Sequence, residues 1–416
     1  MNIVQKVLIY FLMYVLVSLA NTLFAQSKED IDWKKDLSIY KSSLEEKHIN
    51  LYHSITEEEF GKDWNRIYDC VAVLNDFDIT VRLMRLTRRI NDGHTAVSLR
   101  NVPLHRFPLE VEYIDNHWRV FKASKVHEDL LKFTLAGING VPIEKIASKV
   151  AKVAQFVENE YSQVIRTGSY MNISELLFAL GFIQNQQRAV FTFVDPNNKE
   201  VKLTLEALDE AVYNRTTDFV HVSGGVPEIT KPKNAKFPYL WYVPIEGTKA
   251  VYINFESYPT FEEMQGFGEE LMGYISANQI KQVVIDMRHN GGGDLYVGVI
   301  LAYALNLADS IDWENGVFVL TSNRTFSAGT SNAALFKQLL NAKIVGQPTG
   351  SNPNGYQDMD SFMLPGSKLT ITYSKRLFRL SNQENTALQP DMIINQQEQH
   401  FLEGTDTVLK QLIERL

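Results

Sequence analysis

The chain has 416 residues, of which 45% are hydrophobic and 22% are charged, so it can bury a large core and is long enough for two or three domains. Its formal net charge is -8 and the sequence contains no basic stripe. This balance argues against a nucleic-acid partner, because binding to phosphates favours a basic face. Cys70 is the only cysteine, which excludes an intrachain disulfide.

The first residues follow the pattern of an export signal. Lys6 precedes an apolar run over residues 7–20, and Ala25 precedes a polar stretch. We therefore predict a signal peptide of residues 1–25 and an exported protein, periplasmic or extracellular, with no membrane span in the mature chain. Leu23 stands where a small residue is preferred, which leaves an uncleaved membrane anchor as the alternative.

Residues 26–94 are predicted to form a helical N-terminal segment. Its apolar residues recur at helical spacing in two stretches, and Asp78 is expected to cap the second. The periodic residues are Leu37, Tyr40 and Leu44, then Leu83, Leu86 and Ile90.

Residues 95–219 are predicted to be a β-rich middle region. Apolar and polar residues alternate in its first part, with a turn at Asp115–Asn116. Residues 136–146 follow as a strand, an Asn-Gly turn and the start of a helix. The Gly-, Pro- and Thr-rich stretch 220–236 is expected to be a linker.

In residues 237–397, strands and helices alternate, which predicts an α/β core with mostly parallel strands. Chemistry in such a core is expected at the turns from strand to helix. Residues 398–416 are predicted to be a C-terminal helix. The expected strands cover residues 250–255, 282–287, 316–320 and 342–346, and the expected helices lie at 264–275, at 295–307 and after residue 327.

Ser327 lies between one of these strands and an alanine-rich helical run. A serine at a helix start has unpaired backbone N–H groups and the positive end of the helix dipole beside it, and both stabilise an oxyanion. Ser327 is therefore the candidate nucleophile. The alternative is that it only caps the helix, as most serines in this position do.

Three further segments hold groups that such a nucleophile needs. The glycine loop 290–293 follows a buried strand, so its backbone can approach a ligand closely, although such a loop is also a common turn. His94 follows an Asp-Gly turn and could be a base or a surface residue. Glu384 could support a base or be a solvated loop charge.

Taken together, these segments resemble the C-terminal processing and tricorn-type serine peptidases over residues of about 33 to 397. The resemblance rests on the Asp-Gly-His-Thr segment at 92–95, on Val284-Ile-Asp-Met-Arg with the glycine loop, on Phe326-Ser-Ala and on Pro348-Thr-Gly. It implies an α/β fold with a crotonase-like (ClpP/crotonase-type) superhelical catalytic core over residues 237–397. It also implies a PDZ-like module in the middle region, which the closing Ile-Asn-Gly at 138–140 resembles.

The resemblance also implies which residues act. One branch of the family uses a Ser-Lys dyad with the lysine 25 residues after the serine, and Asn352 occupies that position here. The other branch uses Ser, His and Glu, which His94 and Glu384 match in position. The expected oxyanion donors are the N–H groups of Ala328 and Gly292. Asn352 is expected either to orient substrate through its amide or to form a turn.

The resulting hypothesis is an exported serine endopeptidase that acts on peptides or unfolded proteins. It would need no metal or organic cofactor, and no nucleic-acid partner is expected. Two alternatives remain on the same fold, namely a non-proteolytic protein that binds apolar ligands and a pseudoenzyme. Gly329–Thr330, where the family usually has Ser-Glu, leaves the pseudoenzyme open.

Overall fold

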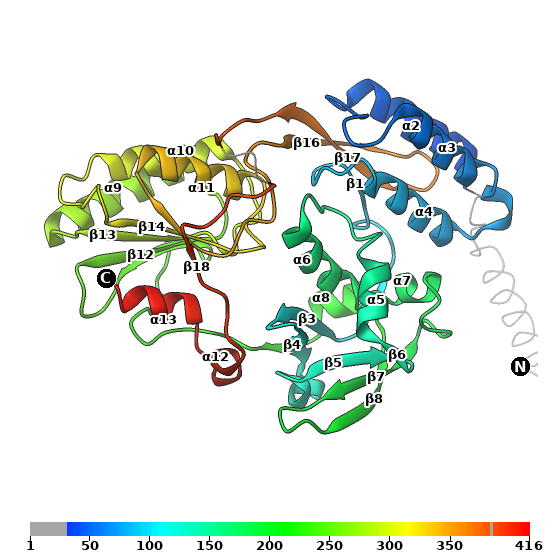
Figure 1. Ribbon diagram of the computed structural model, residues 1–416, viewed down its shortest axis with the longest axis horizontal. Coiled ribbons are helices and arrows are strands. Elements are labelled where there is room, and N and C mark those ends of the chain that lie inside the picture. Colours follow the sequence, from blue (N-terminus) through cyan, green and yellow to red (C-terminus); the bar gives the residue numbers. More distant parts are fainter. Residues whose placement is uncertain (1–30, 383–385) are drawn as a thin grey trace, which may run out of the picture.

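The structure is a computed structural model that describes residues 31–382 and 386–416. It has a mixed α/β fold with three main sheets (Figure 1). The N-terminal segment is helical, as predicted, over the residues that the structure describes. Its helices are α2 (Trp33–Lys47), α3 (Glu57–Tyr68) and α4 (Asp76–Arg88), with a 3-10 turn at Val71–Val73.

Helix α4 begins before the predicted cap. Asn75 is the N-cap residue, and its Oδ1 accepts the backbone N–H of Asp78 at 2.9 Å. The Asn75 amide also donates to the Asp78 carboxylate at 2.6 Å. Asp78 is thus the third residue of the helix, so the prediction that it caps the helix is wrong: Asn75 supplies the capping oxygen instead.

The middle region contains a sheet with the strand order β10-β4-β5-β7-β8, in which β3 pairs with β4 and β6 with β5. The β3–β4 turn at Asp115–Asn116 has positive φ angles of 47° and 63°, as an Asp-Asn hairpin turn permits. The strands are β3 (Leu109–Ile114), β4 (His117–Ser124), β5 (Thr134–Ile138), β6 (Val141–Pro142), β7 (Arg188–Val194), β8 (Glu200–Glu206) and β10 (Phe219–His221).

Short helices and a small strand pair surround this sheet. The helices are α5 (Ile143–Val150), α6 (Glu160–Tyr170), α7 (Ser174–Ala179) and α8 (Glu210–Arg215), with a 3-10 segment at Lys125–Leu130. The strands β2 (His105–Arg106) and β9 (Leu208–Asp209) pair with each other. One hydrophobic cluster joins the N-terminal helices to this region, with Leu37, Phe107 and Phe191 among its fully buried members.

The third part of the chain forms a six-stranded sheet of order β11-β12-β13-β14-β15-β18. All its pairings are parallel except that of β11 with β12, which agrees with the predicted parallel α/β core. The strands are β11 (Leu240–Pro244), β12 (Ala250–Phe255), β13 (Gln282–Asp286), β14 (Val317–Thr321), β15 (Lys343–Gly346) and β18 (Met392–Ile393).

Helices cover both faces of this sheet. Helices α9 (Phe261–Asn278), α10 (Leu295–Asn306) and α11 (Ala328–Leu339) lie on one face, and α12 (Glu398–Glu403) and α13 (Thr407–Ile413) lie on the other side (Figure 1). The predicted single C-terminal helix is therefore two short helices. Gly404 separates them with a left-handed φ of 74°, which ends α12 as glycine often does.

A third sheet joins early and late parts of the chain. In it β1 (Ala96–Ser98) pairs antiparallel with β17 (Thr370–Leu377), which pairs with β16 (Tyr356–Met363). Figure 1 shows β16 and β17 reaching from the six-stranded sheet to the N-terminal helices. Since β1 begins two residues after His94, this sheet anchors that histidine to the late part of the chain.

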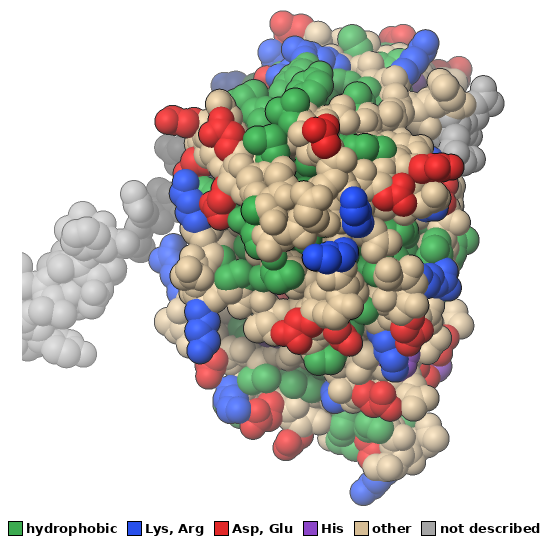
Figure 2. Space-filling model, turned by 90° about the vertical axis from the view of Figure 1, so that its left-hand side faces the viewer, with side chains coloured by type: hydrophobic (Ala, Val, Ile, Leu, Met, Phe, Trp, Pro, Cys, Tyr) green, Lys and Arg blue, Asp and Glu red, His purple; other side chains and the backbone are tan. Residues whose placement is uncertain are grey.

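On the face shown in Figure 2, positive and negative side chains are interspersed, and hydrophobic side chains gather near the top. Helix α10 exposes two large apolar side chains, Tyr296 and Tyr303, and Leu307, the residue directly after the helix, is also exposed. None of the helices within residues 31–382 and 386–416 has the length and apolar character needed to cross a bilayer. The predicted signal peptide, residues 1–25, lies outside the described residues.

Candidate active site

Ser327 lies in the turn between β14 and α11, with a φ of 51° and a ψ of -127°. A positive φ is uncommon for a serine and stores strain of a kind that concentrates at functional sites. The turn is held by the Ser327 N–H, which donates to the Ser351 hydroxyl at 2.8 Å. The Ser327 side chain makes no capping hydrogen bond with the helix, so its hydroxyl is free for another role.

The partner of this hydroxyl is His94. The distance from His94 Nε2 to Ser327 Oγ is 2.9 Å, although the two residues lie 233 positions apart in the sequence. The His94 ring is buried and contacts the Phe326 ring, with centroids 5.3 Å apart. Burial lowers the pKa of His94, against opposing effects of Asp92 and the Tyr356 backbone. The ring is therefore neutral near pH 7, and which of its nitrogens can accept a proton depends on the tautomer.

Asp92 fixes the backbone that presents His94. Its Oδ1 accepts the N–H groups of His94 and Thr95 at 2.9 and 2.7 Å, and the Ser374 hydroxyl at 2.8 Å. The Thr372 hydroxyl donates to the His94 carbonyl at 2.7 Å. Two residues of β17 thus hold the histidine loop in place, which sequence patterns gave no sign of.

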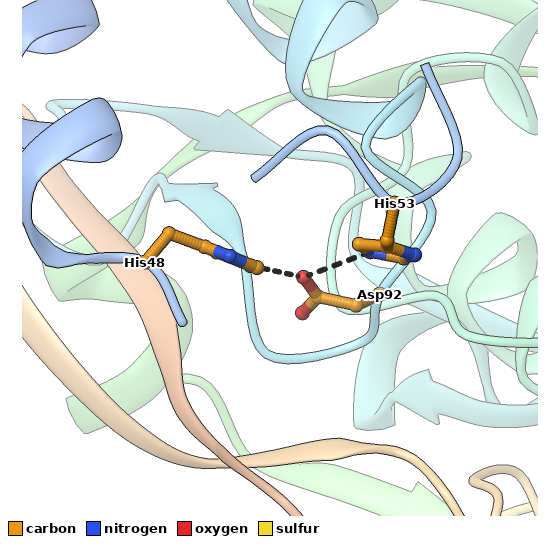
Figure 3. Close-up of side chains that lie close together, drawn as sticks. All are labelled: His48, His53 and Asp92. Carbon is orange, nitrogen blue, oxygen red and sulfur yellow. Dashed lines mark hydrogen bonds and ion pairs between the residues drawn. The ribbon is translucent and has the colours of Figure 1, made fainter. Parts of the chain in front are cut away.

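Asp92 also contacts two histidines, shown in Figure 3, whose ligand atoms lie close enough together for a metal ion. His48 Nε2 is 2.8 Å from Asp92 Oδ2, and His53 Nε2 is 3.9 Å from the same oxygen. However, His48 Nδ1 accepts the Asn50 N–H at 2.9 Å. The Nε2 of neutral His48 therefore carries the proton and donates it to Asp92, leaving no lone pair for a metal. His48 therefore fits a hydrogen-bonded support for Asp92 better than a metal ligand.

The glycine loop lies directly against Ser327. A Cβ on Gly292 would stand 2.7 Å from Ser327 Cβ, and Gly292 has a φ of 109°, so only glycine fits this close approach. The Asn290 carbonyl accepts the Phe326 N–H at 3.0 Å, and Asn290 Oδ1 accepts the Gly292 N–H at 3.0 Å. The predicted donor at Gly292 is thus already engaged within the loop.

The other predicted oxyanion donor is the N–H of Ala328, the first residue of α11. It has no acceptor among the hydrogen bonds of residues 31–382 and 386–416, as is normal for the first N–H groups of a helix. Asn352 forms a turn, since its Oδ1 accepts the Asn354 N–H at 2.9 Å. Whether its amide also orients substrate remains a prediction.

The predicted third member, Glu384, lies outside the described residues. A different glutamate, Glu158, stands beside the histidine, with its Oε2 4.0 Å from His94 Nδ1. Its Oε1 accepts the Asn352 N–H at 3.1 Å. The Glu158 side chain is buried between the segments that carry His94 and Asn352. Its local sequence gave no sign of a role at the site, because only folding brings it to His94.

Comparisons with known proteins identify the fold of the chain. No family model matches the chain, and no curated protein matches it in sequence. A crystal structure of mature CPAF aligns with a TM-score of 0.67 over 92% of this chain and 95% of that one, at 13% identity. The chain has the CPAF fold.

Two other structures align over similar lengths. The CPAF S499A mutant gives a TM-score of 0.64 at 12% identity, covering 89% of this chain and 94% of that one. The photosystem II D1 C-terminal processing protease gives 0.42 at 11% identity, covering 88% and 93%.

Proposed function

We propose that the protein is an exported serine endopeptidase in which Ser327 is the nucleophile and His94 the general base. The observation that supports this most directly is the 2.9 Å distance between His94 Nε2 and Ser327 Oγ, at the start of a helix. A neutral imidazole at this distance can take the hydroxyl proton while Oγ attacks a peptide carbonyl. The CPAF fold and the resemblance to C-terminal processing and tricorn-type peptidases agree with this assignment.

The reaction follows from these positions. Ser327 Oγ bonds to the carbonyl carbon, and His94 receives the proton at Nε2. The tetrahedral intermediate then collapses as His94 gives this proton to the leaving amine, which leaves an acyl ester on Ser327. Water, deprotonated by His94, hydrolyses the ester and restores the enzyme.

The oxyanion of the intermediate needs preorganised donors. The N–H of Ala328 at the start of α11 is the first, and a donor of this type is worth about 3 kcal/mol in the transition state. The Gly292 N–H becomes the second only if Asn290 Oδ1 releases it. Because Gly292 lies directly against Ser327, we keep its N–H as the proposed second donor.

The proposal also covers the domains, the substrate class and the third catalytic residue. The six-stranded sheet with α9–α11 is assigned as the crotonase-like core, and the middle sheet as a PDZ-like module. The substrate is assigned as a peptide or an unfolded protein outside the cytoplasm. Glu384 stays the sequence-based prediction for the third catalytic residue.

The test is Ser327→Ala, measured as peptide hydrolysis and thermal melting on the same preparation. Because the Ser327 side chain makes no capping bond, we expect the melting temperature to stay within a few degrees while hydrolysis falls to background. A serine-reactive phosphonate should label the wild-type protein and not the variant. An unlabelled wild type without hydrolysis would instead support the apolar-ligand carrier or the pseudoenzyme.

A further inference from the structure

We propose that Glu158 is the positioning residue that sets the tautomer of His94. This inference rests on the proposed function. His94 Nδ1 and Glu158 Oε2 are both buried, neither has a hydrogen-bond partner within the described residues, and they lie 4.0 Å apart. Burying two polar atoms without partners costs free energy of folding, unless the two atoms form a hydrogen bond with each other. The separation exceeds a hydrogen bond, but such contacts are often long without substrate and shorten in the reacting complex.

The surroundings leave a space that fits the carboxyl group. A Cβ on Gly93 would lie 2.9 Å from Glu158 Oε2, and one on Gly355 would lie 2.5 Å from Oε1. The Glu158 N–H donates to the Ser162 hydroxyl at 3.0 Å, which ties the residue to the start of α6. With Oε1 held by the Asn352 N–H, the other oxygen is directed at the histidine.

The ionised carboxylate selects the tautomer that catalysis needs. An ionised Glu158 accepts the proton of Nδ1–H, and this leaves the lone pair of Nε2 facing the Ser327 hydroxyl. A protonated Glu158 would donate its own proton to Nδ1. His94 would then carry its proton at Nε2 and could not accept one from Ser327.

The charges around Glu158 decide when it ionises. Burial raises the pKa of Glu158 to about 8, against the Asn352 N–H, and the negative charge of Asp92 adds to the rise. The nearby cations, Arg88 and Arg166, donate to the carbonyls of Val157 and Phe156 at 3.1 and 3.3 Å rather than to the carboxylate. On His94 itself, burial lowers the pKa most and Arg166 adds to this, while Asp92, the Tyr356 backbone and Asp358 oppose it. Because His94 and Glu158 face each other, they titrate as a coupled pair, and kcat/KM should rise with pH through about 8.

Replacement by glutamine tests the proposal, because each oxygen of Glu158 has its own contact: Oε1 accepts the Asn352 N–H and Oε2 faces His94 Nδ1. A glutamine has one oxygen, and the Asn352 N–H requires it at the Oε1 position. The NH₂ group then faces His94 Nδ1 and donates to it, which fixes the wrong tautomer. We expect Glu158→Gln to lower kcat by about 10²- to 10⁴-fold, with KM changed less than threefold.

The matched control is Glu175→Gln. Glu175 is also a buried carboxylate bound to a histidine, with His105 Nδ1 at 2.7 Å, but it contacts none of the site residues. This variant should keep the wild-type kcat and the rise through about pH 8. In Glu158→Gln, that rise should disappear.

A second measurement separates a positioning role from a loss of folding. Nitrogen-15 NMR of the histidine rings in the Ser327→Ala background should show His94 protonated at Nδ1 above pH 8, and at Nε2 once Glu158→Gln is added. Glu158 has no such role if the Glu158→Gln variant has a kcat within threefold of wild type, the same pH profile and the same Nδ1–H tautomer of His94. Ser327→Ala would still test the proposed function independently, and a loss confined to Glu384→Gln would identify Glu384 as the orienting residue.

Discussion

The most constrained single side chain of the site is Asp92, which receives hydrogen bonds from two backbone N–H groups, a serine and a histidine. Burial alone would raise the pKa of Asp92, but the hydrogen bond from His48, the nearby His53 ring and the hydrogen bond from Ser374 outweigh it and hold the pKa far below the usual range. A carboxylate with a depressed folded pKa stabilises the protein above its unfolded pKa of about 3.9. That stabilisation is lost as the pH falls below this value.

We expect Asp92→Asn to lower the free energy of unfolding by about 3 kcal/mol at pH 7, since it removes a buried charge and leaves donors without an ionised acceptor. Urea unfolding at pH 7 and at pH 3 measures the effect. The gap between variant and wild type should narrow at pH 3, where the wild-type carboxylate has begun to lose its advantage because the unfolded chain takes up the proton first. An equal gap at both values would show that the charge of Asp92 does not contribute.

At the scale of elements, helix α9 shows how local sequence fixes a boundary. The Thr260 hydroxyl accepts the Glu263 N–H at 3.3 Å, and the Glu263 carboxylate accepts the Thr260 N–H at 2.9 Å. This reciprocal capping box satisfies two N–H groups that would otherwise lack partners.

Loss of this cap should cost stability without touching the site. Thr260→Ala should lower the free energy of unfolding by about 1 kcal/mol. Thr260→Ser should keep the free energy of unfolding close to that of the wild type, because serine caps as well as threonine. Chemical denaturation compares the two. Hydrolysis by both folded variants should equal that of the wild type, and a loss of activity would mean that the start of α9 reaches the site.

The elements that sequence predicted well are those with strong local signals. The strand over residues 250–255 and the turn at Asp115–Asn116 appear at the predicted positions. The start of α4 was misplaced because Asn75 and Asp78 are both good capping residues, and only the structure shows which oxygen accepts the N–H. The split of residues 398–416 depends on Gly404, whose left-handed conformation a helical pattern does not reveal.

The site was predictable only in part. Ser327 and His94 were chosen from short motifs beside turns, and the structure brings them to 2.9 Å. Glu158 was missed because no local pattern marks it: its partners are residues of distant segments, and burial gives it its chemistry. Sequence periodicity reports local structure and not which remote segments meet.

At the scale of the whole molecule, the third sheet connects the early and late parts of the chain at the site. Thr372 of β17 donates to the His94 carbonyl, so a residue remote in sequence positions the proposed base. Thr372→Val keeps the shape and removes this bond, which should lower kcat about three- to tenfold. Thr370→Val in the same strand is the control, because the Thr370 side chain makes no hydrogen bond with residues 31–382 or 386–416.

Hydrolysis rates at saturating peptide decide between the two variants. Wild-type rates in both variants would show that β17 supports His94 through its backbone alone. A fall in both would point to the stability of the sheet and not to the Thr372 hydroxyl.

The pairing of β1 with β17 also has a consequence for the order in which the protein is made. His94 leaves the ribosome early and Ser327 much later, but the strand that holds the histidine loop leaves later still. Domains form as the chain emerges from its N-terminal end, but the hydrophobic core of the N-terminal helices includes Ile371 and Tyr373 of β17, so this core also stays incomplete until that strand is made. If the protein is a peptidase, the growing chain stays inert until β17 has been synthesised and has paired, and it cannot cut itself or its neighbours during translation.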